Sequence, residues 1–338
     1  MTISLDELTV FILSRDRNLH LESTISYYKE LDIKLVVLHK TKVPVDKKYL
    51  YPKLTYKVVD ESYARRCSIS LNYIDTPYAI LSTDDERYLP TTLISMLQAL
   101  KSNNNTMSVG AQAIALLSYH SLVGGQVLYK YLHGYSNTNN DVNSRVLMHF
   151  VNSESSITFS AMYRMYRSKD FGKMLKLFSL NDEVSTALIT EVTSEVFSLS
   201  LGNVVYLDEL LWIRNFMVEP INTSDWSRSL TFIDWWRDTR YESERLKWVN
   251  NITSFLGDVN FIIEKVIINR SNEEFISNKV RYKYISEKFK YLIRRMLKPK
   301  SLPTSIELTC KELKQLNIRY SEDELKHAIT SMRSPFLK

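Results

Sequence analysis

Cysteine, glycine and proline are scarce in this sequence, at two, seven and eight of 338 residues. The two cysteines, Cys67 and Cys310, allow at most one disulfide and lack metal-binding spacing, which excludes a disulfide-rich module and a zinc module. No Gly-rich phosphate loop followed by Lys lies near the N-terminus, which argues against a nucleotidyltransferase. No apolar run reaches the ~18 residues of a membrane span. Residues 1–8 carry acids where a signal peptide is basic, so the cytoplasm is the expected compartment.

Basic charge is concentrated in one segment. The chain has a net charge of +6, and residues 279–300 contain nine Lys or Arg and one acid, so the remainder is close to neutral. Five apolar side chains there share one helical face: Ile285, Phe289, Leu292, Ile293 and Met296. Such a helix can lie on an anionic membrane or dock on the protein core. No nucleic-acid motif accompanies it, so a nucleic-acid partner is not expected.

Short apolar runs alternate with helical periodicity over the first two thirds of the chain. Strands are predicted at 8–13, 34–38, 54–59, 78–81, 108–117 and 204–207, and helices at 21–31, 64–73 and 93–100. This βαβ rhythm predicts an α/β protein with a mostly parallel, Rossmann-like sheet flanked by helices. The rhythm fades after about residue 220, which predicts two parts, 1–220 and a mainly helical 221–338.

Three other segments have distinctive composition. The polar stretch 134–143 is predicted to be a mobile loop, and the alternating aromatic stretch 156–167 to be a strand lining a pocket. The tryptophans of 225–255 are spaced as core residues more than as a sugar platform. They are Trp226, Trp235, Trp236 and Trp248.

An acidic cluster, Thr83-Asp84-Asp85-Glu86, directly follows the apolar run 78–82. Adjacent carboxylates at the end of a buried strand repel one another and lose hydration, so they are costly unless a hard divalent cation lies among them. Open α/β sheets also bind ligands at the carboxyl ends of their strands. The cluster therefore predicts a site for Mn²⁺ or Mg²⁺, and a solvated turn is the alternative.

A second acidic pair, Asp182-Glu183, precedes a helical pattern that continues through Val192. Acids in a first helical turn complement the helix dipole, so capping is one interpretation of this pair. A carboxylate that removes a proton from an attacking hydroxyl is the other.

Several separated motifs occur in an order that resembles the GT-A fold nucleotide-sugar glycosyltransferases, especially their large inverting family used in bacterial surface polysaccharide synthesis. The resemblance covers roughly residues 8–215. It depends on Phe11 to Arg17 with Asp16 where Asn is commoner, Arg65-Arg66, the Thr-Asp-Asp form of the DxD motif at 83–90, Asp182-Glu183, Gly202 and Arg214. No single motif is specific, whereas their order and spacing are fairly so.

The resemblance implies a role for each motif. Asp85 would hold the metal, with Glu86 as the alternative ligand, and the cation would offset the charge of the departing diphosphate. Glu183 would be the general base, with Asp182 as the fallback. Contacts to the nucleotide sugar would come from Ser14, Arg15, Arg17, Asp60, Arg65, Arg66, Thr83, Asp84 and Arg214.

One departure from the family pattern concerns the donor base. An Asp that reads the base commonly follows the second strand, whereas here the strand runs into His39-Lys40-Thr41-Lys42. The resemblance therefore implies a nucleotide-sugar donor without fixing its base. It implies a glycan or lipid-linked glycan acceptor and suits an enzyme at the inner face of the plasma membrane. A retaining transferase is the nearest alternative, followed by a sugar nucleotidyltransferase and a basic nucleic-acid-binding protein.

Overall fold

The computed structural model describes residues 4–119, 122–128, 135–151, 161–182, 189–215, 232–265, 267–268 and 305–333. Glu183, Trp226 and the basic segment 279–300 lie outside these residues, so their predicted roles stay predictions. Within the described ranges, none of the helices is long and apolar enough to cross a membrane.

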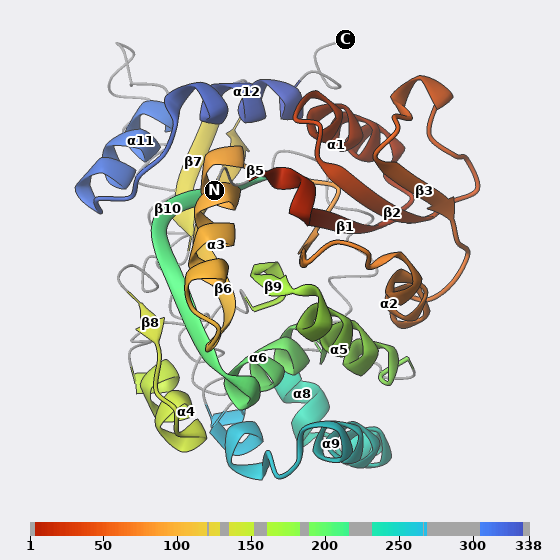
Figure 1. The fold of residues 1–338 in the computed structure, drawn as a ribbon. Helices are drawn as coiled ribbons and strands as arrows, with labels where there is room; N and C mark the ends of the chain where they lie inside the picture. Colours follow the sequence, from red (N-terminus) through yellow and green to blue (C-terminus); the bar gives the residue numbers. More distant parts are fainter. Residues whose placement is uncertain are drawn as a thin grey trace.

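The N-terminal part of the sheet is parallel. Its strands, in spatial order, are β3 (Leu54–Val58), β2 (Lys34–Lys40), β1 (Leu8–Arg15) and β4 (Tyr78–Ser82). Strands β1, β2 and β4 are almost continuously apolar because helices cover both faces. Figure 1 shows α1 (Asn18–Glu30) on one side of these strands, and α2 (Tyr63–Ser70) and α5 (Ser168–Ser179) on the other. The carboxyl ends of all four strands therefore share one edge of the sheet.

The rest of the sheet is mixed and continues in the order β4, β9, β6, β10, β5. Strands β6 (Thr106–Tyr119) and β10 (Asn203–Asn215) are parallel, whereas β9 (Met165–Arg167) is antiparallel to β4 and β6. The antiparallel additions are β5 (Glu86–Tyr88) and β8 (Ser136–Asn137) on β10, and β7 (Leu122–Leu128) on β6. Helix α3 (Pro90–Ser102) packs on β6 and β10.

The remaining helices extend the core. They are α4 (Val142–Val151), α6 (Ile189–Leu201), α8 (Phe232–Arg237), α9 (Glu242–Leu256), α11 (Ser305–Gln315) and α12 (Glu322–Arg333). Short 3-10 helices occupy Leu5–Glu7, Lys47–Tyr49, Leu71–Tyr73, Ala161–Tyr163 and Thr239–Tyr241. Helix α11 contacts β7, and α12 contacts α1 and β10. The predicted α/β class, with a sheet flanked by helices and a helical C-terminal part, is confirmed.

Predictions about individual segments had mixed outcomes. Trp235 and Trp248 are fully buried and packed edge to face, which confirms the core interpretation for them. The loop predicted for 134–143 is wrong in part, because Ser136–Asn137 pairs with β10 and α4 begins at Val142. The strand predicted for 156–167 is wrong at Ala161–Tyr163, where the chain forms a 3-10 helix, and is confirmed at Met165–Arg167, which is β9. Asp182 lies in a turn after α5, not in a helix.

A buried network of charged and hydroxyl groups joins Arg164, which directly precedes β9, to side chains of β10, α4 and α6. Arg164 donates from Nε to Tyr206 Oη at 2.8 Å, and its Nη2 lies 3.6 Å from Glu195 Oε2. His149 Nε2 lies 3.4 Å from the same carboxylate oxygen. Burial alone would raise the pKa of Glu195, but Arg164 and His149 bring it below its ordinary value. Glu195 is therefore an ionised, buried counterion for Arg164.

Replacing Glu195 with Ala should cost about 3–5 kcal/mol of unfolding free energy, because the Arg164 charge would remain buried without its counterion. The wild-type contribution is present above the ordinary pKa of a Glu and is lost as pH falls through the lowered folded-state pKa. Urea unfolding of wild type and variant between neutral and acidic pH measures this. An Arg164→Met/Glu195→Met double variant should recover most of the loss, and equal stability of wild type and Glu195→Ala contradicts the assignment.

Candidate functional site

The acidic cluster lies where β4 ends, beside the end of its parallel neighbour β1. The register pairs Phe11 with Leu81 and Ile12 with Ser82, so the chain segments that follow the two strands leave the sheet side by side. Ser14 Oγ donates to Asp84 Oδ2 at 2.5 Å. Asp84 is only 4% exposed. The carboxylates predicted from the sequence are thus at the carboxyl ends of the parallel strands, where open α/β sheets bind ligands, and Asp84 does not extend into solvent.

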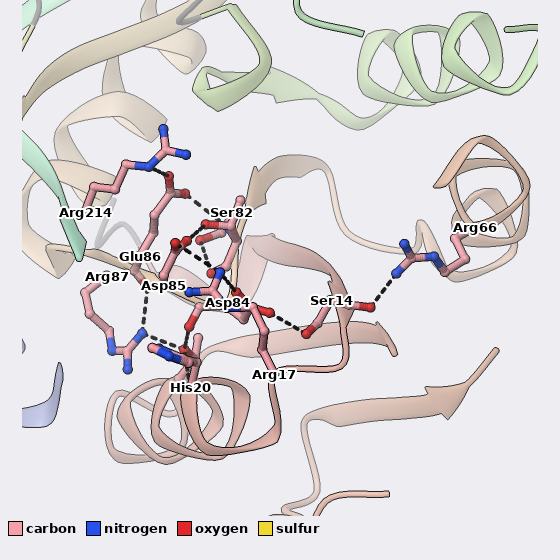
Figure 2. A network of polar contacts seen from close by, with 12 residues as sticks. Ser14, Arg17, His20, Arg66, Ser82, Asp84, Asp85, Glu86, Arg87 and Arg214 are labelled. Atoms are coloured by element: carbon pink, nitrogen blue, oxygen red, sulfur yellow. Dashed lines mark hydrogen bonds and ion pairs between the residues drawn. The ribbon is translucent and has the colours of Figure 1, made fainter. Parts of the chain in front are cut away.

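Arg17, in the loop between β1 and α1, joins the two aspartates. Its Nη1 lies 2.8 Å from Asp84 Oδ1 and 3.1 Å from Asp85 Oδ2. Figure 2 marks the ion pairs of this network by dashed lines. Thr83 Oγ1 donates to the other oxygen of Asp85. Two carboxylates therefore converge on one cationic atom.

Glu86 faces a different direction. Its carboxylate accepts a hydrogen bond from Thr83 N at 3.2 Å and lies 3.8 Å from Arg214 Nε. The pairing of β5 with β10 causes this, because it places Arg214 directly opposite Glu86. Glu86 is fully buried, whereas Arg214 is partly exposed. The structure therefore separates Glu86 from the point on which Asp84 and Asp85 converge.

Burial and neighbouring charges set the ionisation of the three acids differently. Burial, together with the charge of Asp85, raises the pKa of Asp84 to about 6 against the opposing effect of Arg17. Burial would raise the pKa of Asp85 too, but Arg17 and Arg214 bring it below the ordinary value. Burial raises the pKa of Glu86 to about 8. Asp85 is therefore the acid most strongly held in its ionised form at neutral pH, as a metal ligand must be.

The two arginines of α2 differ in role. Arg66 is buried and its Nη1 donates to the carbonyl oxygens of Ser14 (2.5 Å) and Leu38 (3.2 Å), which ties the ends of β1 and β2 together. Arg65 is exposed. Asp60 is also exposed and pairs with Lys40 at 3.2 Å. Arg15, at the end of β1, is exposed beside Asp16.

Asp182 approaches the same edge of the sheet from α5. It accepts a hydrogen bond from the Ser62 hydroxyl, the N-cap of α2, which follows β3. This contact joins positions 120 residues apart in the sequence. Asp182 is thus brought to the carboxyl edge that carries the acidic cluster, and the predicted base Glu183 is its neighbour outside the described residues.

Sequence reasoning missed the support beneath the cluster. Thr24 on α1 donates to the Asp84 carbonyl oxygen at 2.6 Å, and Asn215 N donates to the Asp85 carbonyl oxygen at 2.9 Å. Arg87 is buried and contacts α1 and α12. No sequence motif indicates Thr24 or Asn215. The position of Arg87 directly after three acids is a signal in the sequence that could have indicated it.

The donor set fits a divalent cation. In the described part of the chain, no three His, Cys, Asp or Glu side chains form a complete metal cage. Mg²⁺ at nucleotide sites is usually held by one or two carboxylates together with substrate phosphates, so a pair of aspartates suffices. The convergence of Asp84 and Asp85 on the positive Arg17 Nη1 shows that both can face one cation.

No family model matches the sequence, and no curated protein is similar to it. Several solved structures share weak structural similarity. A crystal structure of S. aureus TarS 1-349 is 9% identical, with 80% of this chain and 92% of that chain covered and a TM-score of 0.42. The mannosyltransferase PcManGT from Pyrobaculum calidifontis, in complex with GDP-Man and Mn²⁺, is 10% identical, with 98% and 87% covered and a TM-score of 0.42.

A third structure, a putative glucose-1-phosphate thymidylyltransferase from Bacillus anthracis in complex with a sucrose, is 12% identical. It covers 61% of this chain and 88% of its own, with a TM-score of 0.31. Similarities of this strength do not establish what the chain does. The function is therefore argued from the residues at the sheet edge.

Proposed function

We propose that the chain is a metal-dependent glycosyltransferase that moves a sugar from a nucleotide-sugar donor to a hydroxyl of a glycan or lipid-linked glycan, with inversion. The observation that carries the proposal is the convergence of Asp84 and Asp85, with Ser14 and Arg17, at the carboxyl ends of β1 and β4. Such edges are where open α/β sheets bind nucleotides. Buried carboxylates gathered there are costly unless a cationic ligand complex compensates them.

The position of each side chain in the site suggests its proposed role. Asp85 is the proposed ligand for Mn²⁺ or Mg²⁺, which would offset the charge of the leaving diphosphate. Asp84, which Ser14 holds in place, would accept a hydrogen bond from a hydroxyl group of the nucleotide-sugar donor. Such a charge-assisted hydrogen bond would orient the sugar. Glu86 is the fallback metal ligand, because its carboxylate faces Arg214. Arg17 and Arg214 are the cations that pair with carboxylates of the cluster, and they are the proposed partners for the phosphates.

Proton removal from the acceptor is proposed for Glu183, with Asp182 as its fallback. The Ser62 contact supports this, because it brings Asp182, the residue before Glu183 in the sequence, to the edge that carries the cluster. A carboxylate on the face opposite the leaving diphosphate gives inversion at the anomeric carbon. Retention uses the same fold and metal motif, so the anomeric configuration of the product decides between them.

A thermal-shift screen of nucleoside diphosphates, with and without Mn²⁺, tests the proposal. A ligand that binds only the folded protein adds ~2.7 kcal/mol to the free energy of unfolding when its concentration is one hundred times its Kd. The melting temperature rises as a result. We expect one nucleotide to stabilise the chain only when Mn²⁺ is present, and this also identifies the base that the sequence leaves open. Absence of any metal-dependent shift across the common nucleotides contradicts the proposal.

A further inference from the structure

Arg87 is the centre of a set of hydrogen bonds that joins the acidic cluster to the last helix. Its guanidinium donates from Nη1 to Thr24 Oγ1 (2.5 Å) and to the Glu86 carbonyl oxygen (2.9 Å). Nη2 donates to Ser23 Oγ (2.8 Å), and Nε donates to Ser331 Oγ (3.2 Å) on α12. Figure 2 shows Arg87 below the cluster, on the side away from Arg214.

These bonds hold the backbone of the cluster and not its carboxylates. Thr24, which accepts from Arg87, donates to the carbonyl oxygen of Asp84, and Arg87 itself binds the carbonyl oxygen of Glu86. Ser23 donates to the backbone oxygen of Ser331 at 2.6 Å, which closes the connection between α1 and α12. Arg87 and α12 therefore fix the peptide units of the cluster, whereas Ser14, Arg17 and Thr83 contact the carboxylates of Asp84 and Asp85.

The partners of Arg87 are neutral groups. Arg87 is buried, and its hydrogen-bond acceptors are hydroxyl and carbonyl oxygens. Among the described residues no carboxylate forms an ion pair with it. Arg87 therefore contacts the cluster through the peptide oxygen of Glu86 and the hydroxyl of Thr24.

We propose that Arg87 is a positioning residue and that α12, through Ser331, holds the acidic cluster in the geometry that binds the cation and the diphosphate. This inference rests on the proposed function for its consequence in binding. It assigns the end of the chain a role in the site, although α12 and Arg87 are 244 residues apart at their contact. The site is complete only when α12 is docked on α1.

The test uses the full chain and Mn²⁺ alone as the probe. Ser331→Ala removes one hydroxyl from a helix position, and Arg87→Met removes the charge while keeping a long side chain. We expect faster deuterium exchange in the peptide 83–88 for both variants. Loss of a hydrogen bond to a charged group should weaken Mn²⁺ binding, measured by titration calorimetry, by about tenfold. Ser331→Thr, which keeps the hydroxyl, should restore both values.

Glu324→Ala is the matched control on the same helix. Glu324 accepts from Thr91 N (3.2 Å) and Thr91 Oγ1 (2.5 Å) at the start of α3 and takes no part in the hydrogen bonds of Arg87. This variant should lower the melting temperature yet leave the exchange of peptide 83–88 and the Mn²⁺ affinity of the folded protein unchanged. A merely structural role for Ser331 would make the two alanine variants behave alike.

Two results bear on the inference separately from the proposed function. If Ser331→Ala and Arg87→Met both leave the exchange of peptide 83–88 at the wild-type rate, the positioning role is wrong. If the wild-type chain binds Mn²⁺ neither alone nor together with a nucleoside diphosphate, the metal-dependent function is wrong, and the exchange rates alone then decide whether α12 holds the cluster.

Discussion

Asp85→Asn is expected to abolish metal-dependent nucleotide binding and to lower transfer by about 100- to 1,000-fold, the usual cost of removing a group that stabilises developing transition-state charge. The substitution keeps the size of the side chain and the hydrogen bond from Thr83, but removes the charge that a hard cation requires. Titration of the variant with Mn²⁺ and the donor, followed by a transfer assay, measures both effects.

Asp75→Asn is the matched control for Asp85→Asn. Asp75 precedes β4 at the opposite edge of the sheet, is exposed and pairs with Lys34. An exposed ion pair contributes little to stability, so this variant should bind metal and nucleotide as the wild type does. Wild-type Mn²⁺ affinity in Asp85→Asn would move the assignment of the metal ligand away from this residue.

Glu183→Gln is expected to lower turnover by about 100- to 10,000-fold, the range for general acid–base catalysis, while nucleotide affinity stays near the wild-type value. The physical reason is that an amide cannot accept the proton of the attacking hydroxyl, whereas the donor and metal depend on other side chains. Turnover and nucleotide affinity measured on one preparation separate the two effects.

Asp182→Asn distinguishes the two acids of the pair. Its carboxylate accepts a hydrogen bond from Ser62, and an amide oxygen can accept the same bond, so Asp182→Asn should retain most of its turnover. The reverse result, with Glu183→Gln active and Asp182→Asn inactive, would assign the base to Asp182. Full activity in both variants would remove the pair from the mechanism.

The strand and helix pattern of the first half was predictable because it is local. Strands β1, β2 and β4 are continuous apolar runs, and helices follow them with the period that covers a sheet face. The position of the acidic cluster was predictable for the same reason, since it directly follows β4. The short strands β5 and β8 were missed because two or three residues carry no periodicity, and β7 was missed as well.

The sequence did not predict side-chain contacts whose partners come from distant segments. Glu86 was the alternative metal ligand in the sequence, and the pairing of β5 with β10 places it against Arg214 instead. Arg66 was a candidate for the phosphates, and the ends of β1 and β2 occupy its Nη1. Each of these contacts depends on strand order and register, which single-sequence patterns do not specify.

The sequence by itself determined the α/β class and the presence of carboxylates at the end of β4, because hydrophobic periodicity and charge clustering report the burial of neighbouring residues. The tertiary structure alone decided that Arg17 bridges the two aspartates, that Arg214 faces Glu86 and that α12 reaches Arg87. These contacts form only when elements far apart in the chain are packed together. The residue pattern of a single segment therefore does not predict them.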